Sequence, residues 1–159
     1  MSLPIVGDAK LSLNLLSDNL EYAAPKNWVE LALKERTKWK QYVAENVSAG
    51  NKPNSYAQAI GVVNNNCDKR DRIVAAAGGL PAEVTANWKT LDISTVDVEF
   101  GFSCMGYEIS GAWGAKIAQD EREPTNDVIT FCGDGSYLML NSDIYSPVLS
   151  KKKIIEYSF

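Results

Sequence analysis

The sequence feature that most constrains the fold is a mainly apolar segment that leads directly into a glycine-rich turn. Residues 128–132 read Val-Ile-Thr-Phe-Cys, and Gly133-Asp134-Gly135-Ser136 follows them. Continuous apolar strands belong in sheets that are covered on both faces. Ligands of open α/β sheets bind outside the carboxyl ends of the strands. The segment therefore predicts a buried strand that delivers a polar, glycine-rich turn to a ligand-binding edge.

The turn itself has the composition of an anion and metal site. Its glycines, Gly133 and Gly135, let the backbone approach a phosphate, and Asp134 offers a carboxylate oxygen to a divalent cation such as Mg2+. Ser136 can donate a hydroxyl hydrogen bond to the same anion. Asp-Gly is also a common structural turn, and the segment matches neither the Walker pattern nor G-x-G-x-x-G. These residues alone leave both interpretations open.

Two further strand-like runs, with helical patterns between them, predict the architecture of the sheet. Residues 71–77 form an apolar run that Gly78-Gly79 ends, and residues 153–159 form the last run. A helix repeats apolar positions from Ile109 to Ile117, and another is expected from about 141 to 150, shortened by Pro147. Alternation of strand and helix predicts the α/β class. We expect a partial Rossmann-like parallel sheet of three strands with flanking helices, preceded by a mostly helical linker.

The N-terminal part is helical in pattern and poor in chemistry. Asp8 can cap a short helix, and an amphipathic helix is expected from about 27 to 46. Its tryptophans, Trp28 and Trp39, are expected to pack rather than to bind a ligand. Asn54 or Ser55 can cap the next helix.

Charge and hydropathy exclude two classes of partner. The net charge of −4 gives no basic surface for nucleic acid. No apolar run approaches the roughly 20 residues that cross a bilayer, and no signal sequence opens the chain. We therefore expect a cytoplasmic protein that binds neither nucleic acid nor a membrane.

Histidine is absent from the 159 residues, and this limits the possible catalytic groups. A Ser-His-Asp triad, a Cys-His dyad and histidine-ligated zinc cannot be assembled from this chain alone. Cys67, Cys104 and Cys132 are widely spaced, so we expect reduced thiols. Any catalysis must depend on carboxylates, a metal or an organic cofactor.

Three segments together resemble a known enzyme family. They are Ala77-Gly78-Gly79-Leu80-Pro81, residues 99–108 (Glu-Phe-Gly-Phe-Ser-Cys-Met-Gly-Tyr-Glu) and residues 133–140 (Gly-Asp-Gly-Ser-Tyr-Leu-Met-Leu). Residues 71–159 resemble the C-terminal, diphosphate-binding domain of thiamine-diphosphate enzymes of the acetolactate-synthase type. The segment 99–108 is most similar to a subfamily of hydrolases that open trihydroxycyclohexane-1,2-dione in myo-inositol catabolism.

This resemblance implies roles for individual residues and two cofactors, thiamine diphosphate and Mg2+. Asp134 would ligate Mg2+, and Gly133, Gly135 and Ser136 would surround the diphosphate. Met105 and Gly106 would contact the aminopyrimidine. The loop beside them would consist of Gly78, Gly79 and Leu80. In the family the cofactor acts as an electron sink while a C–C bond breaks. The resemblance assigns no catalytic side chain to this chain.

The same resemblance implies that the chain is an internal fragment of a larger enzyme. Residues 1–20 would be the tail of a central domain, 21–54 a helical linker, and 55–159 the first half of the cofactor domain. The asparagine that completes the family's metal motif and the glutamate that activates the cofactor are not found in these residues. The fragment alone is therefore expected to be inactive.

For the parent enzyme, the resemblance implies a cyclic dione substrate and a homodimer or homotetramer. The apolar edge of an unfinished sheet would also allow the fragment to self-associate. Two alternatives stay open at this point. One is a fragment of an acetolactate synthase or another thiamine-diphosphate lyase or decarboxylase, and the other is a noncatalytic α/β interaction module.

Overall fold

The computed structural model describes residues 2, 4–50, 52–122 and 124–159, which form two compact units. The first unit is Met1–Gln41 and the second is Tyr42–Phe159. Each unit is described by itself below. Among the described residues, no helix combines the length and apolar character needed to cross a membrane.

The first unit consists of helical segments with exposed side chains. Helix α1 (Ala9–Asn19) begins at Asp8, whose carboxylate accepts a hydrogen bond from the N–H of Leu11, as the sequence predicts. Helix α2 (Lys26–Val47) starts in this unit and ends in the second one. It has no buried residue, and Trp28 and Trp39 are each more than half exposed. The helix is confirmed, and the expected packing of its tryptophans stays a prediction.

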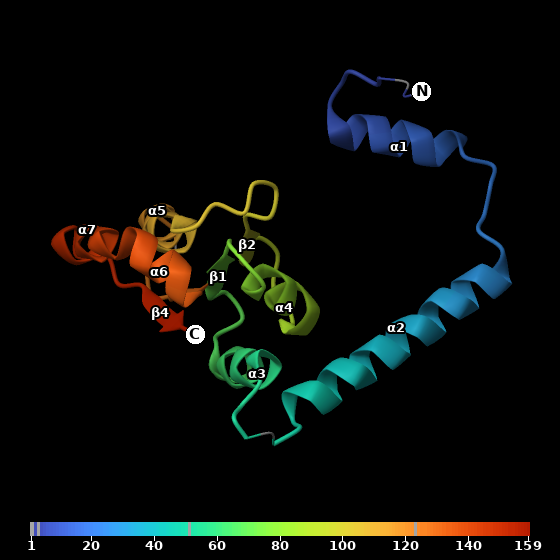
Figure 1. Ribbon diagram of the computed structural model, residues 1–159. Coiled ribbons are helices and arrows are strands. Elements are labelled where there is room, and N and C mark those ends of the chain that lie inside the picture. The colour runs from blue at the N-terminus through green and yellow to red at the C-terminus, as the bar shows by residue number, and fades with distance from the viewer. Residues whose placement is uncertain (1, 3, 51, 123) are drawn as a thin grey trace. The chain divides into compact units, whose positions relative to one another are not determined.

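The second unit contains a four-stranded parallel sheet in the order β2-β1-β3-β4 (Figure 1). The strands are β1 (Arg72–Ala75), β2 (Val96–Val98), β3 (Val128–Cys132) and β4 (Ile155–Ser158). Ile73 of β1 lies opposite Val96 of β2 and Ile129 of β3. The α/β class and the partial parallel sheet are confirmed, with one strand more than the three expected.

The additional strand is β2, which is short and only partly buried. Its sequence is Val-Asp-Val, and all three residues keep some exposure because β2 forms an edge of the sheet. Three residues with a charge in the centre give no apolar run to detect. Pairing with β1 rather than local pattern therefore defines this strand.

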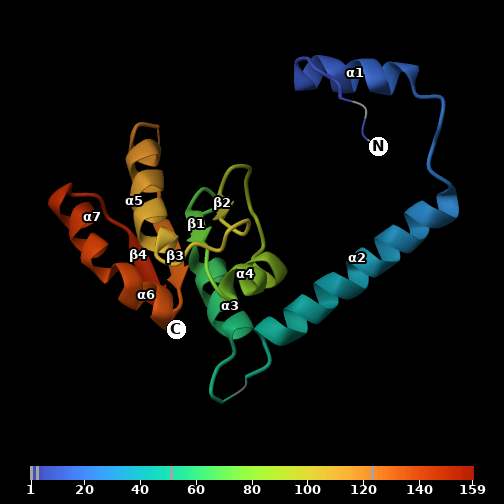
Figure 2. The ribbon, with the colours of Figure 1, turned by 45° about the horizontal axis from the view of Figure 1, so that its top comes forward.

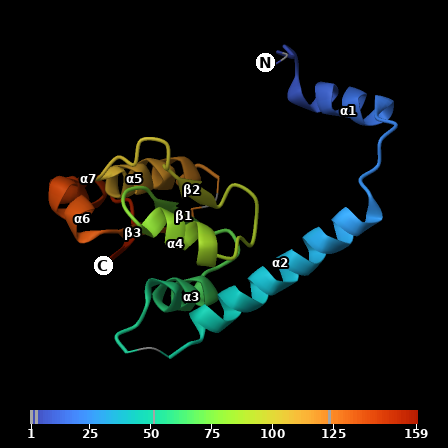
Figure 3. The same cartoon turned by 45° about the vertical axis from the view of Figure 1, so that its right-hand side comes forward.

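Helices cover both faces of the sheet. Helices α3 (Tyr56–Asn66) and α4 (Leu80–Asn87) pack on one face, where Ile60, Ile73, Leu80, Val84 and Phe131 form the main core cluster. Helix α5 (Tyr107–Asp120) packs on the other face through Ala112, which meets Val74 and Val128. Figures 2 and 3 show α3 and α4 on one side of the strands and α5 on the other. Because neighbouring residues of a strand face opposite sides, β1 contributes to both clusters.

The helical region after β3 contains one helix more than the prediction. Helix α6 (Asp134–Leu140) starts at once after Gly133 and is followed by the 3-10 turn η1 (Asn141–Ile144) and helix α7 (Tyr145–Leu149). The helical residues 141–149 of η1 and α7 agree with the helix expected from about 141 to 150, whereas α6 before them was not expected. Gly133 has an extended backbone and ends the strand, so Asp134 already occupies the first helical turn. The shortening expected near Pro147 agrees with the five-residue helix α7.

Candidate functional site

The sheet order places the glycine-rich segments at its topological switch point. From β1 the chain moves outward to β2 and then returns past β1 to β3, so the connections diverge between β1 and β3. Such crevices at the carboxyl ends of strands bind ligands in open α/β proteins. The loop with Gly78 and Gly79 follows β1, and Gly133 and Asp134 follow β3. The two segments that sequence analysis selected therefore flank one crevice.

Glu108 connects three parts of this crevice beneath its surface. Its side chain is fully buried in the first turn of α5. One carboxyl oxygen, Oε1, accepts the N–H of Ala77 at 2.9 Å, and Oε2 accepts the N–H of Gly106 at 3.0 Å. The hydroxyl of Ser136 donates to Oε2 at 2.7 Å. The carboxyl group of Glu108 thus ties the end of β1, the start of α5 and the first turn of α6 together.

Gly106 and Ser136 are also in direct contact. The N–H of Gly106 donates to the Oγ of Ser136 at 2.8 Å. Gly106 has φ +91°, and a Cβ at this position would lie 2.6 Å from the Cβ of Leu140. Only glycine fits this close approach in a left-handed conformation without strain. Two residues predicted for the same site from distant parts of the sequence are therefore hydrogen-bonded neighbours.

Met105 and Gly135 bring the same two segments together at the surface. A Cβ built on Gly135 would lie 3.0 Å from the Cε of Met105. Met105 is half-exposed, and its side chain lies directly against the first turn of α6. Because Gly135 has no side chain, the thioether of Met105 can lie close to the backbone at this position.

The loop before Met105 is held by two carboxyl oxygens of Glu99. Oε1 accepts the N–H of Phe102 at 2.9 Å, and Oε2 accepts the N–H of Cys104 at 2.8 Å. These backbone hydrogen bonds lower the pKa of Glu99 because they stabilise its charged form. In the same loop the Oγ of Ser103 accepts the N–H of Gly78 at 3.3 Å. The loops that follow β1 and β2 are thus linked at the crevice.

Asp134 lies at the exposed start of α6. Its Oδ1 accepts the N–H of Gly135 at 2.7 Å, and its own N–H donates to the carbonyl of Phe159 at 3.0 Å. Within the described part of the chain, no cationic side chain pairs with this carboxylate. Asp134 therefore keeps a carboxylate oxygen available for an external cation.

The space beside the glycines fits a diphosphate group. A Cβ built on Gly78, Gly79 or Gly133 would meet no atom within 4 Å. Open space at the glycines of two neighbouring loops, next to an unpaired carboxylate, suits a metal-bridged phosphate. The residues present therefore fit thiamine diphosphate and Mg2+.

Two predicted contacts lie in surroundings that sequence analysis did not anticipate. Ser136 is 3% exposed, and its hydroxyl hydrogen is donated to Glu108 rather than pointed at the crevice. Leu80 is the first residue of α4 and belongs to the main core cluster. Their roles as cofactor contacts stay predictions. Each residue supports the crevice from beneath.

Sequence reasoning missed Glu108, although a signal was present. Glu108, Ala112 and Lys116 recur every four residues along the face of α5 that packs on the sheet, and all three are buried. A charged residue at an apolar position of a helix indicates a buried polar contact. Lys116 likewise has a polar partner, because its Nζ forms an ion pair with Oδ1 of Asp120 at 2.9 Å.

Comparison with protein families decides what this crevice belongs to. Residues 76–155 match the model of the thiamine pyrophosphate enzyme family, C-terminal TPP binding domain. The match contains the loop after β1, the start of α5 and the first turn of α6. The chain belongs to this family. The match confirms thiamine diphosphate, which was predicted from the sequence, as the cofactor of this domain.

Two curated relatives share one enzyme name. The chain is 34% identical to 3D-(3,5/4)-trihydroxycyclohexane-1,2-dione hydrolase of Shouchella clausii over 94% of its own length and 27% of the relative's length. It is 44% identical to the enzyme of that name from Bacillus anthracis, over 60% of the chain and 14% of the relative. The chain spans about a quarter, or less, of the length of these relatives.

A solved structure supports the fold. It is the X-ray structure of an enzyme from Mycobacterium smegmatis that is provisionally described as thiamin diphosphate-dependent. The TM-score is 0.56 and the sequence identity 17%, over 65% of this chain and 20% of that one. The common fold agrees with membership of the thiamine pyrophosphate enzyme family.

Proposed function

We propose that this chain is part of a thiamine-diphosphate-dependent hydrolase that opens the ring of trihydroxycyclohexane-1,2-dione in myo-inositol catabolism. The observation that carries the proposal is the crevice between β1 and β3, where Met105 lies against Gly135 and Gly106 is hydrogen-bonded to Ser136. The similarity to hydrolases of that name supports the choice of substrate. When bound, the cofactor would supply an electron sink for cleavage of a C–C bond.

In this proposal the residues of the chain bind and orient the cofactor. Asp134 would hold Mg2+ through its free carboxylate oxygen, and the backbone at Gly133 and Gly135 would adjoin the diphosphate. Met105 and Gly106 would contact the aminopyrimidine. Gly78, Gly79 and Leu80 would form the neighbouring wall, and Ser136 would act through its hydrogen bonds from below. Glu108 would keep these segments in register.

The wider features of the protein follow from the same proposal. Residues 1–20 would be the tail of a central domain, 21–54 a linker, and 55–159 part of the cofactor domain. The assembled enzyme would be a homodimer or homotetramer in the cytoplasm. Free thiols at Cys67, Cys104 and Cys132 support a reducing compartment.

The experiment that tests the site is a two-dimensional 15N–1H NMR titration of the chain with thiamine diphosphate, with and without Mg2+. We expect Mg2+-dependent shifts at the amides of Met105, Gly106, Gly133 and Gly135. Asp134→Asn should abolish the Mg2+ dependence, whereas Asp18→Asn, on the exposed surface of α1, should leave it intact. The site would be refuted if these shifts are absent, or if their Mg2+ dependence is the same in the Asp134→Asn variant as in the wild type.

The activity is tested separately, by following ring opening of the dione. We expect the chain alone to give no turnover, because none of its carboxylates is assigned to activation of the cofactor. Turnover by the chain, together with micromolar affinity for the cofactor, would contradict this part of the proposal.

A further inference from the structure

A cavity of about 550 Å3 lies away from the crevice, on the face of the sheet that α5 covers. Several of its lining residues lie at or just before the amino ends of β1 and β2, or in and just after the last turn of α5, namely Arg70, Arg72, Ser94, Thr95, Gln119 and Arg122. Parallel strands have their carboxyl ends at one edge. This cavity therefore opens toward the opposite edge from the Gly-Asp-Gly-Ser segment, and its volume is in the range of ligand sites.

Two buried nitrogen atoms in the cavity lack a hydrogen-bond acceptor within the described chain. They are the Nε of Arg72 and the Nε2 of Gln119. Gln119 is only 9% exposed, so its amide is shielded from bulk water. Arg72 already pairs with Asp97 through Nη1, which leaves Nε for a second acceptor. Buried donors without acceptors are costly, so both atoms indicate an external acceptor.

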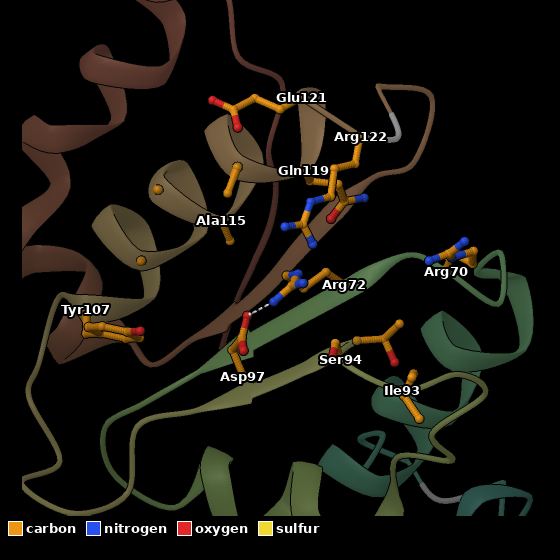
Figure 4. A pocket seen from close by; sticks show the side chains of 14 residues that line it. Arg70, Arg72, Ile93, Ser94, Asp97, Tyr107, Ala115, Gln119, Glu121 and Arg122 are labelled. Carbon is orange, nitrogen blue, oxygen red and sulfur yellow. Dashed lines mark hydrogen bonds and ion pairs between the residues drawn. The ribbon is translucent and has the colours of Figure 1, made fainter. Parts of the chain in front are cut away.

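The charges around these donors favour an anion. Figure 4 shows the side chains of Arg122 and Arg72 directed toward the same space between α5 and the strands, with Gln119 beside Arg122. In the described part of the chain Arg122 has no ion pair, and the carboxylate of Glu121 points away from this space. Asp97 is engaged by Arg72. The donors at this end of the cavity are thus two guanidinium groups and an amide, the pattern that binds oxoanions.

The rest of the cavity has room for an uncharged body. Its α5 wall consists of small residues, Gly111, Gly114, Ala115 and Ala118. A Cβ on Gly114 would meet no atom within 4 Å, so this wall leaves open space. Tyr107 lies at the other end of the lining from Arg122 in Figure 4. The shape therefore suits a molecule longer than an inorganic ion.

We propose that this cavity is a second binding site, which takes a small organic molecule by its oxoanion. The oxoanion accepts hydrogen bonds from Arg72 Nε, Gln119 Nε2 and Arg122, and the remainder of the molecule extends along the small residues of α5 toward Tyr107. The oxoanion end of this site lies at the opposite end of the lining from Tyr107, which follows Gly106 of the thiamine diphosphate crevice. A negative titration at one of the two sites therefore does not decide the outcome at the other.

The test is an NMR titration of the full chain that observes the side-chain N–H signals of Arg72, Gln119 and Arg122. The probes are inorganic phosphate and acetate in separate arms at constant ionic strength, so that a tetrahedral and a planar oxoanion are distinguished. We expect saturable shifts at these three residues with at least one probe. Arg122→Gln should weaken the apparent affinity about tenfold or more, because a charged hydrogen bond is lost.

The matched control is Arg36→Gln, which removes an exposed arginine of α2 and should leave the affinity unchanged. Arg122 is itself exposed, so its replacement is not expected to unfold the protein. Absence of saturable shifts with both probes would overturn the proposal. Equal affinities in the Arg122→Gln variant and the wild type would overturn it as well, since binding would then be general screening by salt.

Discussion

The hydroxyl of Ser136 lies 2.7 Å from the buried carboxyl group of Glu108, and it also accepts the N–H of Gly106. One hydroxyl therefore gives a second partner both to the N–H of Gly106 and to the carboxyl oxygen Oε2 of Glu108, which also bond to each other. This contact joins α6 to the start of α5 at the crevice where the family binds its cofactor. The position of the Gly-Asp-Gly-Ser segment thus depends on the hydrogen bond between Ser136 and Glu108, two side chains that are buried beneath the crevice.

Ser136→Ala should destabilise the fold through this contact. Loss of the hydroxyl leaves the N–H of Gly106 and an oxygen of Glu108 each with one partner fewer, so the free energy of unfolding should fall by about 1–3 kcal/mol. Urea unfolding followed by circular dichroism measures this change. Ser142→Ala, at an exposed position of η1, should change it by less than about 0.5 kcal/mol. Equal effects of the two substitutions would contradict the role of the contact.

Gly106→Ala should be more harmful than a usual glycine substitution. The left-handed backbone costs a side chain about 1–2 kcal/mol. The new Cβ would in addition overlap Leu140. The matched control is Gly101→Ala, whose Cβ would meet only Glu99 Oε1, at 3.7 Å. We expect a large drop in the urea midpoint, or failure to fold, for the first variant and little change for the second. A Gly106→Ala protein of wild-type stability would show that the α5 start can shift.

The sheet could be predicted from sequence because its central strands are buried on both faces. Val128–Cys132 is buried at every position, and its mainly apolar sequence indicates this burial. The edge strand β2 could not be found in this way, since its residues are only partly covered. Helix α6 was missed for a local reason, since Gly-Asp-Gly is typical of a turn and gives no sign that a helix begins at Asp134.

The residues at the surface of the candidate site could be predicted from the sequence, but the buried hydrogen bonds beneath them could not. The glycines and Asp134 could be identified from their residue types and from their positions directly after predicted strands. The link from Glu108 to Ala77 and Ser136 spans 31 and 28 positions of the chain, so only the fold brings these residues together. Sequence spacing along α5 could have identified Glu108 as buried, but not its partners.

The three cysteines should differ in reactivity according to burial. Burial raises the pKa of Cys67 to about 11 and that of Cys132 to about 12, in each case with neighbouring carboxylates adding to the shift. Cys104 is exposed, in the loop before Met105. Because the thiolate is the reactive form, a disulfide reagent near neutral pH should modify Cys104 rapidly and the other two slowly.

Absorbance of the released thiol measures this reaction. We expect one fast equivalent in the native protein and three after unfolding in urea. Cys104→Ser should remove the fast phase. Two or more fast equivalents in the wild-type protein would contradict the expected protection of Cys67 and Cys132.

Glu156→Gln should stabilise the protein near neutral pH. Glu156 lies on β4 opposite Thr130, and its Oε1 is buried without a hydrogen-bond partner within the described chain. Burial, with the nearby carboxyl group of Glu108, raises the pKa of Glu156 above its ordinary value of 4.5. A raised pKa means that the folded state binds the proton more tightly than the unfolded chain. The wild type therefore loses stability as the pH rises from about 4.5 through the folded pKa.

A glutamine carries no charge at any pH, so the variant escapes this loss. Its urea midpoint should exceed that of the wild type near neutral pH, and the difference should shrink as the pH falls below 4.5, where Glu156 is protonated in both states. Glu30→Gln, on the exposed surface of α2, serves as the control and should show no such pH-dependent difference. A Glu156→Gln variant that is less stable than the wild type near neutral pH would indicate that the charged carboxylate has a stabilising partner.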